Sequence, residues 1–137
     1  MGRPKDPLYK AFEGWLNDLT NVRLEQDYLA AVRLVSDVSA TPEDANALLV
    51  SVSDRVEDDN RIRKAGLFAS AVYNRIKPDK LVFDVDAEDI NFIGYRFEGL
   101  LVNNGEAGNW FGQFANGLVV NNGKAGDWFG WNADGLL

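Results

Sequence analysis

The first 78 residues carry apolar side chains at intervals of three and four, the spacing of one face of an α-helix. Four such stripes follow one another. The first and third each begin with a capping residue followed by proline, at Asp6 and at Thr41, and Pro78 ends the fourth. The pattern predicts a bundle of four amphipathic helices over residues 1–78. The stripes consist of Leu8, Ala11, Phe12, Trp15, Leu16 and Leu19; Leu24, Tyr28, Ala31, Val32 and Val35; Ala45, Leu48, Leu49, Val52 and Val56; and Ile62, Ala65, Ala69, Val72 and Ile76.

The hydrophobic period changes from helical spacing to alternation after Pro78. In "KLVFDVD", Leu81 and Phe83 share one face of an extended chain with Val85. The stretch "INFIGYRFEG", residues 90–99, alternates less regularly. Both stretches are predicted to be strands.

An eighteen-residue unit then occurs twice. "GLLVNNGEAGNWFGQFAN" covers residues 99–116, "GLVVNNGKAGDWFGWNAD" covers 117–134, and "GLL" at 135–137 opens a third copy. A unit of this size is too short to fold alone and corresponds to one coil of a stacked structure, which hides its apolar face only against its neighbours.

The repeat predicts specific contacts between equivalent residues of neighbouring coils. Asn103 is expected to meet Asn121, and Asn104 to meet Asn122, in amide ladders, while tryptophan rings stack on one another. The Asn-Gly pairs are typical of tight turns with positive φ, and the Ala-Gly pairs of close backbone approach. The candidate structural residues are Asn103, Asn104, Gly105, Gly108, Trp110, Phe111, Gly112, Asn121, Asn122, Gly123, Gly126, Trp128, Phe129 and Gly130.

The two copies resemble the GXGXG right-handed β-helix family, which includes the C-terminal domain of the glutamate synthase large chain and the C subunit of formylmethanofuran dehydrogenase. The segments "VNNGEAGNWFG" and "VNNGKAGDWFG" carry the resemblance. Glu106 and Lys124 depart from the family's usual asparagine, and single glycines at Gly117 and Gly135 replace its glycine pair. The resemblance covers about the last forty residues. It implies a non-catalytic spacer or docking surface within a larger redox complex.

The predicted fold class is α+β: a helical bundle at 1–78 followed by a right-handed β-solenoid with eighteen-residue coils at 79–137. Residues 79–98 are expected to form irregular first rungs, 99–116 and 117–134 the two repeats, and 135–137 the start of a third. An uncapped coil end exposes strand edges. We therefore expect either a fragment of a longer protein or self-association.

Composition excludes several kinds of chemistry. The chain has no cysteine and no histidine, which removes disulfides, thiolate nucleophiles and histidine bases or metal ligands. The net charge is −7, and most of the acidic excess follows residue 77, so nucleic-acid binding is not expected. No apolar run is long enough to span a membrane, and no secretory signal is evident. We expect a cytoplasmic protein.

The stretch "DVDAED", residues 84–89, gathers four carboxylates, but an EF-hand loop would require glycine and glutamate where Asp89 and Tyr95 stand. We interpret it as a solvated acidic turn. No catalytic residue, cofactor or metal site is predicted.

The sequence favours a non-enzymatic structural or protein-interaction module that binds a protein partner or a second copy. One alternative is an accessory, non-catalytic subunit of a larger redox enzyme complex. Another is a carbohydrate-binding repeat module that uses Trp110, Trp128 and Trp131, which would need open tryptophan faces.

Overall fold

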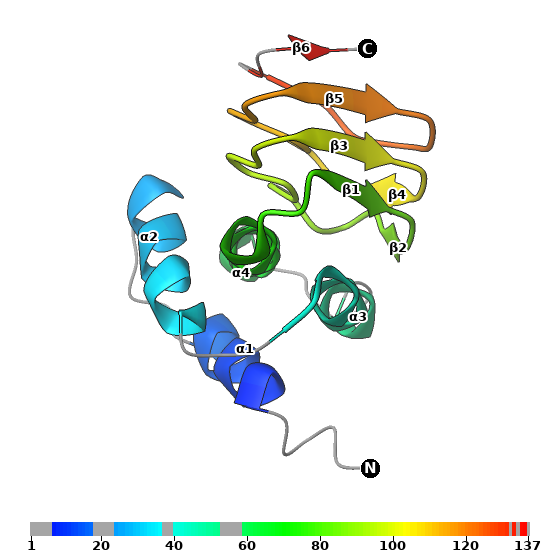
Figure 1. The fold of residues 1–137 in the computed structure, drawn as a ribbon. Coiled ribbons are helices and arrows are strands. Elements are labelled where there is room, and N and C mark those ends of the chain that lie inside the picture. The colour runs from blue at the N-terminus through cyan, green and yellow to red at the C-terminus, as the bar shows by residue number, and fades with distance from the viewer. Residues whose placement is uncertain are drawn as a thin grey trace.

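The computed structural model describes residues 7–17, 24–36, 40–52, 59–131, 133 and 135–136 (Figure 1). The first half of the chain forms helices, of which the last, α4, is central: the other three all pack against it. Their bounds are α1 Pro7–Asn17, α2 Leu24–Val35, α3 Pro42–Val52 and α4 Asp59–Ile76.

Local signals explain where the helices begin and end. Thr41 and Asp44 form a reciprocal cap on α3: the Asp44 amide donates to Thr41 Oγ1 at 3.1 Å, and the Thr41 amide donates to Asp44 Oδ2 at 3.0 Å. At the end of α4, Lys77 takes a positive φ of 53° and its amide donates to the Tyr73 carbonyl, a left-handed C-cap before proline. The cap predicted at Asp6 lies outside the described residues.

The second half forms two small parallel sheets. The larger has the order β1-β3-β5-β6 and the smaller pairs β2 with β4. In the larger sheet Leu81 pairs with Leu101, and Leu101 with Val119, so equivalent residues of successive units lie side by side. The strands are β1 Lys80–Phe83, β2 Asp86–Ala87, β3 Leu100–Asn103, β4 Glu106–Ala107, β5 Leu118–Asn121 and β6 Gly135–Leu136.

We call residues 79–98, residues 99–116 and the residues from 117 onward the three successive layers of the β region. Helix α4 packs directly on the first layer. Gly66 leaves room for the Asn91 carbonyl, since a Cβ there would lie 1.6 Å from that oxygen. Ser70 Oγ donates to the Phe92 carbonyl at 2.9 Å and accepts from the Tyr95 amide at 3.0 Å. One hydrophobic core therefore runs from α1 through α4 into the layers, with Phe12, Phe68, Phe83, Phe97 and Phe111 among its fully buried side chains.

This arrangement overturns the fold class expected from the sequence. A helical bundle followed by a β-solenoid was predicted, whereas in the described residues four helices and two small parallel sheets share one core. The expectation failed because a repeat period says how a chain pairs with itself, but not what else it packs on. The side chains that bind the first layer to α4, such as Ser70, carry no periodic signal.

The strand predicted at 90–99 is also wrong. That segment is a series of turns in which Phe92, Gly94 and Arg96 all take positive φ. The same conformation recurs in the next unit at Trp110, Gly112 and Phe114. We call 92–98 and 110–116 the left-handed turns. Phe92 and Arg96 are residue types that rarely adopt positive φ, so the sequence does not indicate these turns.

The described helices include none that is long and apolar enough to cross a membrane.

Candidate functional site

A groove of about 540 Å³ lies between α2, the end of α4 and the left-handed turns. This is the side on which α2 stands beside α4, away from the β2–β4 sheet (Figure 1). Apolar and polar side chains share its walls. The lining residues are Tyr28, Val32, Ser36, Ala71, Asn74, Arg75, Lys77, Arg96, Glu98, Phe114 and Asn116.

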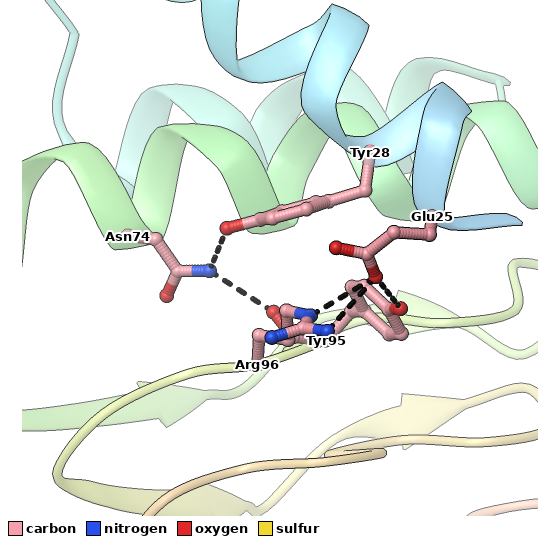
Figure 2. A network of polar contacts seen from close by, with 5 residues as sticks. All are labelled: Glu25, Tyr28, Asn74, Tyr95 and Arg96. Atoms are coloured by element: carbon pink, nitrogen blue, oxygen red, sulfur yellow. Dashed lines mark hydrogen bonds and ion pairs between the residues drawn. The ribbon is translucent and has the colours of Figure 1, made fainter.

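A polar network joins α2 to the first left-handed turn beside this groove (Figure 2). Glu25 Oε1 accepts the Tyr95 hydroxyl at 2.8 Å and the Arg96 guanidinium at 3.0 Å from Nη2 and 3.2 Å from Nε. Three donors therefore converge on one carboxylate oxygen. The network fixes the position of Arg96, whose guanidinium also lies over the rings of Tyr95 and Phe114.

Asn74 of α4 connects the other side of the network. Its amide nitrogen donates to the Tyr28 hydroxyl at 2.6 Å and to the Tyr95 carbonyl at 3.0 Å. Figure 2 shows the amide oxygen turned away from both partners. Asn74 also lines the groove, and an amide oxygen is a hydrogen-bond acceptor.

The tyrosine hydroxyls of this network stay protonated at neutral pH. Burial raises the pKa of Tyr28 above its ordinary value, against the opposing effect of the bond from Asn74. Burial, together with the hydrogen bond to Glu25, raises the pKa of Tyr95 to about 12. The neutral Tyr28 hydroxyl accepts from Asn74 and the neutral Tyr95 hydroxyl donates to Glu25, and both bonds hold the walls of the groove in place.

Two cations on the rim are available to a ligand. Among the described residues Arg75 and Lys77 take part in no ion pair, and both are exposed. Arg75 Nε donates to the backbone carbonyl of Ser36 at 3.2 Å, which holds its guanidinium at the end of α2. Arg96, by contrast, is already neutralised by Glu25. Glu98 is the carboxylate that lines the groove.

The residues that the sequence singled out lie along the stack of layers. As predicted, Asn103 Nδ2 donates to Asn121 Oδ1 at 3.0 Å, and Asn122 Nδ2 donates to Asn104 Oδ1 at 3.0 Å. Asn103 is fully buried and also donates to the Lys124 carbonyl at 2.8 Å. The asparagines therefore bind one layer to the next.

The aromatic residues stack in the same direction. Trp110 lies between Phe92 and Trp128, with ring centroids 5.0 and 6.4 Å apart and nearly parallel planes. Phe111 stacks on Phe129 at 5.4 Å. The predicted stacking of the tryptophans is confirmed, and the sequence did not indicate that Phe92 extends it.

The glycines of the repeat divide into two groups. Gly112 and Gly130 have positive φ. Gly105 and Gly123 were predicted to have positive φ, and this is wrong. They are needed because a Cβ at either position would lie 2.2 to 2.3 Å from a carbonyl oxygen of the layer before. At Gly108 and Gly126, as at Gly105 and Gly123, atoms of the preceding layer leave no room for a Cβ.

A second amide ladder was not predicted. Asn91 Oδ1 accepts the Asn109 amide at 2.8 Å, and Asn109 Oδ1 accepts the Asp127 amide at 2.8 Å. The signal was present in the sequence: "NFIG" at residue 91 has the same form as "NWFG" at 109 and "DWFG" at 127. The groove has no comparable signal, because its residues come from three separate segments.

The acidic turn forms a carboxylate cluster with the repeat. Asp86, Glu88 and Glu106 place carboxylate oxygens within 4.8 Å of one another. The hydrogen bond with Glu88, and then the charge of Asp86, raise the pKa of Glu106 above its ordinary value. Carboxylate oxygens are the donors that Ca²⁺ and Mg²⁺ prefer. The exposure expected for Asp86 and Glu88 is confirmed, but the participation of Glu106 was not foreseen.

No protein-family model, no curated protein and no solved structure matches this chain. The resemblance of residues 99–134 to the GXGXG family therefore stays a prediction, as does the domain division at residue 78.

Proposed function

We propose that the protein is a non-enzymatic interaction module that holds a peptide segment of a partner protein in the groove between α2, α4 and the left-handed turns. The observation that carries the proposal is the mixed lining of this groove. Val32 and Phe114 expose 37% and 39% of their surfaces there, beside the free cations Arg75 and Lys77. A peptide offers both the apolar side chains and the backbone groups that such a lining can bind.

The walls of the groove support binding over chemistry. The side chains of Tyr28, Asn74 and Tyr95 join α2, α4 and the first turn: Asn74 donates to the Tyr28 hydroxyl and to the Tyr95 carbonyl, and the Tyr95 hydroxyl donates to Glu25. A site held in this way keeps its shape, which reduces the entropy lost on binding. The high pKa of Tyr95 makes its hydroxyl a poor base or nucleophile at neutral pH.

The exposed side chain of Phe114 offers a hydrophobic contact for an apolar side chain of the bound peptide. Its ring centroid lies 6.0 Å from that of Tyr95 and 5.9 Å from that of Trp131, both in edge-to-face geometry. This arrangement leaves part of the Phe114 ring open to solvent. Aromatic residues held by neighbours contribute strongly to binding because little conformational freedom remains to be lost.

A peptide-display library selected against the wild-type protein tests this function. Selected peptides are then measured on two matched variants. Asn116→Trp fills the groove from an exposed position on its rim, while Ala47→Trp places the same indole at an exposed position on α3 that does not line the groove. We expect Asn116→Trp to weaken binding at least about tenfold and Ala47→Trp to leave it unchanged. Equal binding by both variants, or no selected peptide at all, would refute the proposal.

A carbohydrate-binding module is the second candidate, favoured by the exposure of two tryptophans. Trp128 exposes 56% and Trp131 44% of its surface, whereas both faces of Trp110 are covered by stacked rings. Tryptophan fluorescence during titration with soluble glucan oligosaccharides tests this candidate. A saturable shift that Trp128→Ala removes would support it. The role as a subunit of a redox complex and the cytoplasmic location stay predictions.

A further inference from the structure

We propose that the partner segment bound in this groove is acidic, with apolar side chains between its carboxylates. The inference rests on the proposed function and names the chemistry of its ligand. It follows from the charges at the groove, which differ in sign from those of the chain as a whole. The net charge of the protein is −7, yet the charged residues that line the groove are the cations Arg75, Lys77 and Arg96 and the carboxylate Glu98. With Arg96 paired to Glu25, two cations stand against one carboxylate among the described residues of the lining.

The positions of the cations follow from the end of α4. Arg75 lies in the last turn of this helix and Lys77 is its left-handed cap. Cations here oppose the partial negative charge of the helix C-terminus. This interaction with the helix dipole needs only a positive charge near the last carbonyl groups of α4. The bond from Arg75 Nε to Ser36 additionally holds the guanidinium against α2, at the wall of the groove.

The neighbouring carboxylates leave this charge incompletely neutralised. Glu25 accepts hydrogen bonds from the Arg96 guanidinium and from the Tyr95 hydroxyl, so its negative charge is engaged by the first left-handed turn. Glu98 is the carboxylate that lines the groove together with Arg75 and Lys77. Within the described part of the chain, the rim therefore attracts an anionic group, and it does so beside apolar surface that lowers the local dielectric.

The apolar part of the segment is specified by Val32 and Phe114. Both are partly exposed, and the ring of Phe114 lies 5.8 Å from the central carbon of the Arg96 guanidinium. The amide oxygen of Asn74 offers an acceptor for a backbone N–H of the bound segment. A segment that alternates carboxylates with leucine or phenylalanine offers anions to the cationic rim and apolar side chains to Val32 and Phe114. Its backbone N–H groups can donate to Asn74.

Fluorescence anisotropy with defined peptides tests the charge preference. The probe is the labelled peptide Glu-Leu-Glu-Phe-Glu-Leu-Glu, compared with the same peptide in which glutamine replaces each glutamate. We expect the acidic probe to bind at least about tenfold more tightly at low salt, with an advantage that falls as salt rises. The double variant Arg75→Glu with Lys77→Glu should abolish the advantage.

The matched control carries the same charge change elsewhere. Lys10→Glu with Lys80→Glu reverses two exposed lysines that do not line the groove, and it should keep the preference for the acidic probe. Arg75→Lys with Lys77→Arg keeps both charges and should retain most of it. Circular dichroism of each variant verifies that α4 is intact.

The outcomes separate this inference from the proposed function. If both probes bind equally and Asn116→Trp weakens both, the groove binds peptides without a preference for acids, and the inference is overturned while the function stands. If the acidic probe binds as well to the Arg75/Lys77 double variant, the inference is overturned. Binding of neither probe overturns it too. Anionic vesicles or single-stranded RNA that bind more tightly than the acidic probe would overturn it in favour of that ligand.

Discussion

Replacing Asn103 with alanine tests the idea that buried amides bind one layer to the next. This side chain is fully buried and makes three hydrogen bonds: it donates to Asn121 and to the Lys124 carbonyl, and it accepts from the Gly105 amide. Each such bond contributes about 0.5–1.5 kcal/mol net to stability. Asn121 and Lys124 are exposed and can turn to water, and the Gly105 amide keeps its bond to the Phe83 carbonyl. We therefore expect a loss of about 2–3 kcal/mol in the free energy of unfolding.

Asn121→Ala is the matched control, because it removes the equivalent residue from the next layer. Asn121 is exposed, and its side-chain oxygen accepts from Asn103 and from the Gly123 amide. After the substitution Asn103 Nδ2 keeps its bond to the Lys124 carbonyl, and the Gly123 amide keeps its bond to the Asn103 carbonyl, so the expected cost is about 0.5–1 kcal/mol. Urea unfolding followed by tryptophan fluorescence measures both variants, with unchanged m-values as the condition for comparison. A cost for Asn103→Ala no larger than that for Asn121→Ala would refute the reasoning.

Three further predictions concern packing, titration and an unpaired polar group. Gly66→Ala drives a methyl group into the Asn91 carbonyl and should lower the melting temperature strongly, whereas Gly14→Ala on α1 meets open space and should raise stability by about 0.5–1 kcal/mol in the same thermal scans. The raised pKa of Tyr95 means that the folded state holds its proton more tightly than the unfolded state. The corresponding stability is present below pH 10 and should be lost as pH rises toward about 12, and Tyr95→Phe should remove this step from ultraviolet titrations. Among the described residues the buried Oε1 of Gln113 has no hydrogen-bond partner, so Gln113→Met should raise the urea midpoint, and a fall would show that the oxygen is satisfied in solution.

The helices could be predicted from the sequence because their signals are local. The cap at Thr41 and the apolar stripe of α3 are both read from neighbouring residues. The cap is confirmed, and so is the stripe as far as Val52, while Val56 lies outside the described residues. Val32 is the exception in α2: it belongs to the apolar stripe but is exposed beside the groove. Periodicity reports which residues share a face, and not whether another element covers that face.

The contacts between repeats could also be predicted, because identical units pair with residues of the same kind. The bonds of Asn103 and Asn104 with their counterparts follow from the period alone. The fold class could not be predicted, since it depends on the contact between Ser70 of α4 and the turn at Phe92. Two single residues far apart in the chain produce no pattern that a sequence reveals.

The groove was beyond sequence reasoning for the same reason. Arg75 and Lys77 look like ordinary cations at a helix end, and Phe114 like any aromatic residue of the repeat. Their meeting depends on how α2 lies against α4 and on the positive φ of the left-handed turns. Such a conformation in a non-glycine residue is rarely evident from the residue itself.

Amide chemical-shift mapping by nuclear magnetic resonance tests the central claim most directly. The isotope-labelled protein is titrated with the acidic probe peptide, and each backbone signal is followed to saturation. The account predicts that the largest shifts cluster at Asn74, Lys77, Phe114 and Asn116, around the groove. Shifts confined to the opposite end of the strands, at residues 104–106 and 122–124, or no saturable shift at any residue, would contradict it.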